Sequence, residues 1–171
     1  MSAAVKAEFD GLDKELLYKR PAPSANTVGF LYWHILRIWD LDLNHFVKQQ
    51  APDQDLWHRG GYSEKSGYNP DGKGLSRLAG MGLGYSDEEV DEVSAASLDA
   101  LHDYHDALLA ETTEILSGDT DLRAEFSPAG RPKMTAAQRM QHLVGHTYGH
   151  VGDMRFVKGL LGHTDATYPK G

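Results

Sequence analysis

Three of the nine histidines lie in one short stretch near the end of the chain, HLVGHTYGH at residues 142–150, and are spaced four residues apart. On a helix, residues at this spacing are about 6 Å apart along the axis, so two imidazoles can bind one metal ion. Residues eight apart are separated by about 12 Å and cannot share an ion. One ion can therefore take His146 with His150, or His142 with His146, but not all three.

The pair formed by His146 and His150 is favoured by its position on the predicted helix. His150 lies within the apolar face and His146 lies beside it. Gly145 and Gly149, which precede the two histidines, lower helix propensity, as expected where something must approach the backbone closely. Two polar side chains on a buried face need partners, and one metal ion would serve both. Without a metal, His150 would be a hydrogen-bonded core residue and His146 a boundary residue.

A third ligand has to come from another helix, and His34 is the best candidate. It shares a helical face with Phe30 and Ile38 in a segment that is apolar on nearly all sides and is therefore expected to be deeply buried. His45 lies on almost the same side of this helix but about 16 Å further along the axis, so it cannot reach the same ion. The predicted metal ligands are His34, His146 and His150.

The remaining histidines are assigned other roles. His105 occupies an apolar face and is interpreted as a core residue, or, like Asp40, as a residue that hydrogen-bonds a metal ligand. His102 stands among acidic residues and is predicted to be at the surface. His58 and His163 lie in a predicted loop and in the tail, where solvated side chains are expected. No catalytic residue is assigned.

Helical periodicity and its end signals predict the elements that position these residues. A capping box at Ser86 and Glu89 and another at Thr135 and Gln138 mark two helix starts, and Gly162 marks a helix end. The expected helices cover residues 4–19, from Ser24 or Asn26 to 50, 86–116 and 135–162.

No segment alternates apolar and polar residues as a half-buried strand does, so the predicted fold class is all-α. We expect one domain over residues 1–171, a four-helix bundle in up-down-down-up order. A long crossover connection, residues 51–85, joins helices two and three and is predicted to be an ordered flap whose Trp57 and Tyr62 wall the site. The glycine-rich run GMGLG at 80–84 follows no strand and is given no cofactor role.

Composition limits the classes of partner and ligand. The chain has 171 residues, enough for one core, and no cysteine, so any metal must be held by nitrogen and oxygen atoms. A net charge of −8 without a dense Lys/Arg stripe argues against nucleic acid as a partner. No apolar run is long enough to span a membrane and the first residues lack the pattern of a secretion signal, so we expect a cytoplasmic protein.

Two segments resemble one known family. NTVGFLYWHILRIWD at 26–40 and HTYGHVGDMRFVKGLLG at 146–162 resemble the second and last helices of the DinB-like (DinB/YfiT) proteins. GLGYSDEEV at 82–90 is similar to the segment that leads into the third helix in some members. These are four-helix bundle proteins described as metalloenzymes and related to bacterial thiol-dependent isomerases and S-transferases. The resemblance implies a metal triad at His34, His146 and His150.

The chain departs from the family pattern at two positions. Asp153 stands where members often have glutamine, which implies different hydrogen bonding near the metal. Lys158 stands where arginine is common, and a lysine cannot make the same bidentate contact with an anion. Dimerisation through helix faces is compatible with this fold, although no residue pattern requires a homodimer.

The ligand set indicates the chemistry. Three neutral nitrogen ligands suit a divalent transition metal such as Zn²⁺, Ni²⁺ or Fe²⁺, and they leave at least one coordination position open, as in catalytic zinc sites. The leading hypothesis is a metal-dependent enzyme acting on a small-molecule substrate, and the resemblance implies a thiol-dependent S-transferase that uses a low-molecular-weight thiol. The alternatives are a metal-dependent hydrolase that activates water and a non-catalytic metal-binding bundle protein.

Overall fold

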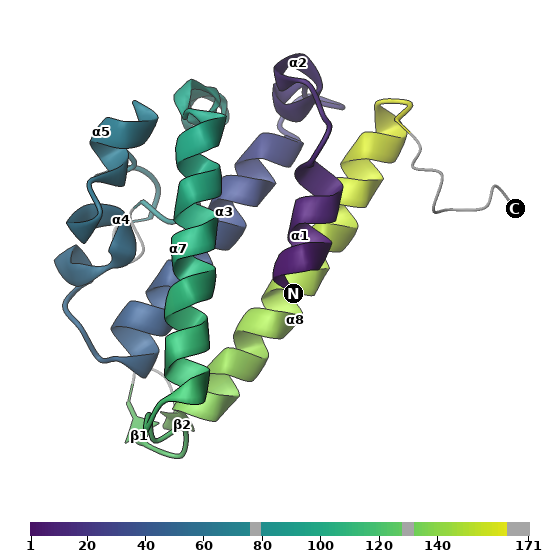
Figure 1. Cartoon of the computed structure of the whole chain (residues 1–171). Helices are drawn as coiled ribbons and strands as arrows, with labels where there is room; N and C mark the ends of the chain where they lie inside the picture. The colour runs from purple at the N-terminus through teal and green to yellow at the C-terminus, as the bar shows by residue number, and fades with distance from the viewer. Residues whose placement is uncertain (76–79, 128–131, 164–171) are drawn as a thin grey trace, which may run out of the picture.

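The computed structural model describes residues 1–75, 80–127 and 132–163, and this part of the chain is mostly helical (Figure 1). The all-α prediction is confirmed in this respect. The longest helices are α3 (Val28–Asp40), α7 (Leu98–Ser117) and α8 (Ala136–Leu160). α3 packs against α7 and α8, and the shorter α1 (Ser2–Phe9) packs against α3 and α8.

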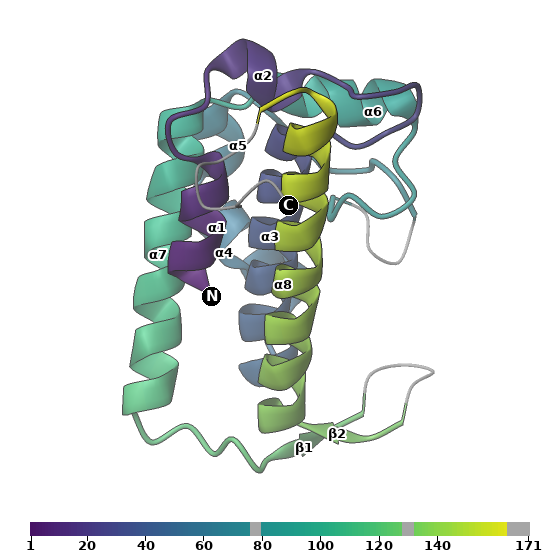
Figure 2. The same ribbon diagram turned by 90° about the vertical axis from the view of Figure 1, so that its right-hand side faces the viewer.

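Shorter elements close the two ends of the molecule (Figure 2). At one end lie α2 (Lys14–Tyr18) and α6 (Asp87–Glu92). At the other end two strands, which the sequence did not predict, form an antiparallel pair between α7 and α8. The strands are β1 (Glu125–Phe126) and β2 (Met134–Thr135), and the remaining elements are η1 (Leu41–Val47, a π-helix that continues α3), η2 (Pro52–Gln54), α4 (Leu56–Arg59), α5 (Tyr62–Ser66) and η3 (Val93–Ala95).

Several predicted helix ends are confirmed. Ser86 and Glu89 form a capping box at the start of α6, and Thr135 and Gln138 form one at the start of α8. Gly162, with a φ of 79°, follows the end of α8 in the left-handed conformation. These signals act within a few residues, which is why they can be recognised without knowledge of the fold.

Two predicted helices are divided in the structure. The segment 4–19 is broken after α1 at Gly11, which has a φ of 80°, and Asp13 then caps α2 through the Leu16 N–H. The segment 86–116 is broken at Ala96, where the backbone is extended, and Ser97 caps α7. In both places a local cap interrupts a periodic apolar pattern.

The cap of α3 also differs from the prediction. Thr27, and not Ser24 or Asn26, accepts the capping hydrogen bond, which the Phe30 N–H donates. Threonine is a good N-cap residue because its hydroxyl satisfies an N–H group at the helix start. The helix therefore begins at Val28, and all 13 of its residues are buried.

The connection 51–85 is a set of short helices and turns, and its residues 76–79 lie outside the described part. Trp57 and Tyr62 are buried, and their rings pack on the ring of Tyr104 from α7, with centroids 5.1 and 4.7 Å away. Aromatic side chains bury large apolar areas, so these two residues stabilise the core. The prediction that they wall the metal site is wrong.

Among the described residues, no helix combines the length and the apolar character needed to cross a membrane.

Candidate metal centre

The structure brings His34, His146 and His150 together between α3 and α8. Each offers one nitrogen, and these three atoms all lie within 4.8 Å of one another. The ring centroids of His146 and His150 are 4.5 Å apart, and that of His34 is 5.2 and 5.0 Å from them. The helical spacing sets the first distance and the packing of α3 on α8 sets the other two. Three nitrogens this close can converge on one ion.

The imidazoles of His34 and His146 are in the charge state that a metal requires. Burial lowers the pKa of His34 to about 4, although a hydrogen bond to the Met81 carbonyl opposes the shift. Burial also lowers the pKa of His146 to about 3, and the neighbouring imidazoles of His150 and His34 lower it further. Both side chains are therefore neutral near pH 7, and a neutral imidazole is a metal ligand.

Hydrogen bonds orient two of the three rings. The Nδ1 atom of His34 lies 2.5 Å from the carbonyl oxygen of Met81, and that of His150 lies 2.8 Å from a carboxylate oxygen of Asp153. Each contact leaves Nε2 as the nitrogen available to an ion, an arrangement common for metal-binding histidines. The buried Nδ1 of His146 has no hydrogen-bond partner among the described residues. This donor set fits a divalent transition metal.

The backbone of Gly80–Gly84 was not predicted to contribute to the site. Gly82 has a φ of 87°, and a Cβ atom there would lie 2.8 Å from Nδ1 of His34. Only glycine leaves room for the Met81 carbonyl to reach this ring. The alternating glycines of GMGLG were the signal in the sequence for this backbone conformation, because residues 80, 82 and 84 all have positive φ.

The predicted supporting residues Asp40 and His105 have other partners. Asp40 accepts hydrogen bonds from Arg37, Tyr104 and the Trp57 N–H within the core. His105 lies between the Ser2 and Tyr32 hydroxyls, 2.8 and 2.9 Å away. The core interpretation of His105 is confirmed, but the metal-supporting role is wrong for both residues. Asp40 and His105 both form their hydrogen bonds with other residues of the core.

Arg37 supports the site indirectly. Its Nε donates to the Gly80 carbonyl at 3.1 Å, and its other nitrogens contact Asp40 and Asp55 at 3.2 and 2.9 Å. Gly80 precedes Met81, whose carbonyl contacts His34. A buried ion network thus fixes the segment that orients one predicted ligand.

The other histidines lie apart from the triad or at its edge. His142 is half exposed, and its Nδ1 is 3.8 Å from a carboxylate oxygen of Asp42. His45 contacts the carbonyl of Gln50 at 3.0 Å. His102 is only partly exposed and its ring packs on that of Phe9.

The prediction of a solvated His58 is wrong. This residue belongs to α4, and its two ring nitrogens lie 2.6 Å from Asp55 and 3.1 Å from Asp71. Hydrogen bonds and charges of these carboxylates raise its pKa against the opposing effect of burial. His163 is also only partly exposed.

The two departures from the family pattern have distinct structural roles. Asp153 lies one turn after His150 and contacts it directly, as noted above. Lys158 is buried, and its Nζ lies 2.6 Å from a carboxylate oxygen of Glu8 on α1. Lys158 therefore joins α8 to α1.

Fold and site together define a mostly helical protein with three convergent histidines on two packed helices. The chain belongs to the DinB superfamily, whose family model matches residues 2–154. A conserved protein from Enterococcus faecalis with a known crystal structure is similar in fold, with a TM-score of 0.73 at 18% identity over 95% of this chain and 91% of that one. No curated protein matches the chain.

Proposed function

We propose that the protein binds one divalent transition metal ion, Zn²⁺, Ni²⁺ or Fe²⁺, through His34, His146 and His150. The observation that supports this most directly is the convergence of three nitrogen atoms within 4.8 Å from two helices. The lowered pKa values of His34 and His146 favour the neutral forms that bind metal. The orienting contacts of Met81 and Asp153 are typical of residues that support metal ligands.

We further propose that the site is catalytic. A divalent ion held by three neutral ligands keeps its charge and an open position, and would activate a thiol or a water molecule there. His34 and its Met81 contact would fix one ligand on the rigid α3. Asp153 would hold the proton on Nδ1 of His150, so that Nε2 faces the ion.

Thiol-dependent S-transfer to a small electrophilic substrate is the leading reaction. The chain has no cysteine, so the sulfur would come from a low-molecular-weight thiol. A metal-dependent hydrolase is the alternative. If added thiol is consumed only when substrate is present, the protein is a transferase. If product forms without thiol, the protein is a hydrolase. A metal-bound protein with neither activity would support a non-catalytic binding role.

Metal content tests the site itself. Protein purified without an affinity tag should carry about one transition metal ion per chain, and His146→Ala/His150→Ala should carry none. His142→Ala is the matched control, because it removes a histidine from the same helix one turn away. Loss of metal in the control, with retention in His150→Ala, would instead assign the ion to the pair 142 and 146. Failure of the native protein to take up added Zn²⁺ or Ni²⁺ would refute the proposal.

We also propose that residues 1–171 form one four-helix bundle in which α1, α3, α7 and α8 run in up-down-down-up order. The packing of α3 against α7 and α8, and of α1 against α3 and α8, supports this arrangement.

A further inference from the structure

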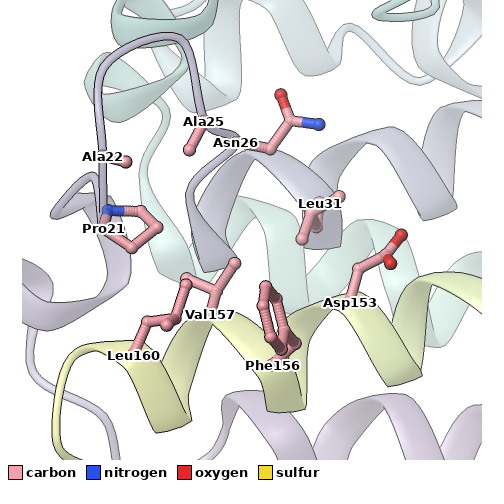
Figure 3. A pocket seen from close by; sticks show the side chains of 9 residues that line it. All are labelled: Pro21, Ala22, Ala25, Asn26, Leu31, Asp153, Phe156, Val157 and Leu160. Carbon is pink, nitrogen blue, oxygen red and sulfur yellow. The ribbon is translucent and has the colours of Figure 1, made fainter.

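A pocket lies beside the candidate metal centre, between α8 and the segment that precedes α3 (Figure 3). Its cavity volume is about 420 Å³, within the range of small-molecule sites. Leu31 of α3 also lines it. The other apolar lining residues come from the two sides: Pro21, Ala22 and Ala25 from the segment, and Phe156, Val157 and Leu160 from α8.

The polar groups of the pocket gather at one end. Figure 3 shows the side chains of Asn26 and Asp153 at the end opposite to Pro21 and Leu160. Asp153 is the residue that contacts Nδ1 of His150 at 2.8 Å. The pocket is therefore apolar at its far end and polar at the end where Asp153 contacts the imidazole of His150.

We propose that this pocket binds the uncharged, apolar body of a compact small-molecule substrate whose polar end lies at Asp153. The volume is that of a small molecule, and the apolar wall needs an apolar occupant. In the metal-free protein the Asp153 carboxylate at the polar end repels anions, so an occupant with a negative charge should bind more weakly there. That the occupant reacts at the neighbouring metal site rests on the proposed function, but binding in the pocket does not.

Two dyes with the same aromatic frame test the shape and charge of the site. N-phenyl-1-naphthylamine is uncharged, and 1-anilinonaphthalene-8-sulfonate adds one sulfonate. In metal-free protein, fluorescence titration should show saturable binding of the uncharged dye, about one per chain, and roughly tenfold weaker binding of the sulfonate. Asp153→Asn should reduce this difference. Absence of saturable binding of the uncharged dye would overturn the proposal.

Leucine substitutions at equal exposure locate the dye. Leu160 lines the pocket and is 57% exposed, whereas Leu116 on α7 is 58% exposed and lies elsewhere. Leu160→Ala should weaken binding of the uncharged dye about fivefold because it removes apolar contact area, and Leu116→Ala should leave it unchanged. Ala25→Trp should block the pocket. Equal effects of the two leucine variants, or full binding in Ala25→Trp, would refute this location.

Three further outcomes separate the competing explanations. If dye binding falls as protein concentration rises and the chain associates, a second copy covers this face and the small-molecule proposal is wrong. If the dye binds as expected in a protein that takes up no metal, the pocket stands and the proposed metal function fails. If the protein takes up metal but does not bind the dye, the metal site stands and the pocket proposal fails.

Discussion

Replacing Gly82 by alanine should cost more free energy in metal binding than in the stability of the fold. The new Cβ would lie 2.8 Å from Nδ1 of His34, and 3.1 Å from ring atoms of both Phe30 and Trp33. All three neighbours belong to the buried helix α3, so the glycine segment has to move instead. That movement would take the Met81 carbonyl away from His34 and release the orientation of one predicted ligand.

The expected magnitudes follow from two separate effects. A non-glycine residue in the left-handed region costs about 1–2 kcal/mol, which lowers the free energy of unfolding. Loss of a residue that orients a metal ligand weakens metal affinity roughly 10–100-fold. Gly72→Ala is the matched control, because Gly72 has a φ of 77° in the same connection but no atom of the described residues within 4 Å of its Cβ position. The control should show the first effect alone.

Competition between the protein and a chromogenic chelator for Zn²⁺ measures the affinity, and urea unfolding in the presence of EDTA measures the stability of the metal-free fold. Wild-type affinity in Gly82→Ala would refute the role of the Met81 carbonyl. Equal losses of affinity in Gly82→Ala and Gly72→Ala would show that backbone strain, and not the contact with His34, is responsible.

Three further substitutions test the fold around the site. Burial lowers the pKa of His105 to about 4, so its neutral form stabilises the fold above the unfolded pKa of about 6.5, and this stability is lost as the pH falls towards 4. Between about pH 7.5 and 5.5, metal-free wild-type protein should lose about 1 kcal/mol more unfolding free energy than His105→Gln, and equal losses would contradict the assigned shift. Arg37→Met should lower the free energy of unfolding by about 3–5 kcal/mol because it removes the guanidinium that the buried carboxylates of Asp40 and Asp55 contact, and an unchanged urea midpoint would exclude that role. Thr135→Ala should lower the stability of α8 by about 1 kcal/mol because Gln138 N–H loses its cap, whereas Thr113→Ala, at an exposed position within α7, should have a smaller effect.

Local geometry explains what the sequence could predict of the site. The helical period places His146 and His150 one turn apart on the same side, whatever surrounds them. His34 could be selected because its helix is apolar on nearly all sides and must therefore lie at the centre. The structure brings the three side chains together, and metal binding by them stays a prediction.

The supporting contacts could not be predicted because they depend on long-range packing. The Met81 carbonyl is a backbone group, and no side-chain pattern marks its position. Asp40 stands on the same helix as His34, but its interactions with Tyr104 and the Trp57 N–H follow from the placement of α7 and the connection. The breaks at Gly11 and Ser97 had local signals, yet the longer apolar periodicity around them favoured continuous helices.

The position of Arg37 gives the buried ion network a role beyond stability. Removing charges from water is costly, and a network of this kind is a poor way to gain stability alone. Here one arm of the guanidinium holds the Gly80 carbonyl while the others contact Asp40 and Asp55. The segment that orients His34 is thereby fixed to the core before any ion binds. His146, whose buried Nδ1 has no hydrogen-bond partner in the described structure, is not held in this way. A metal ion would therefore bind the imidazole of His34 in an orientation that is already fixed. Its binding would then order the ring of His146.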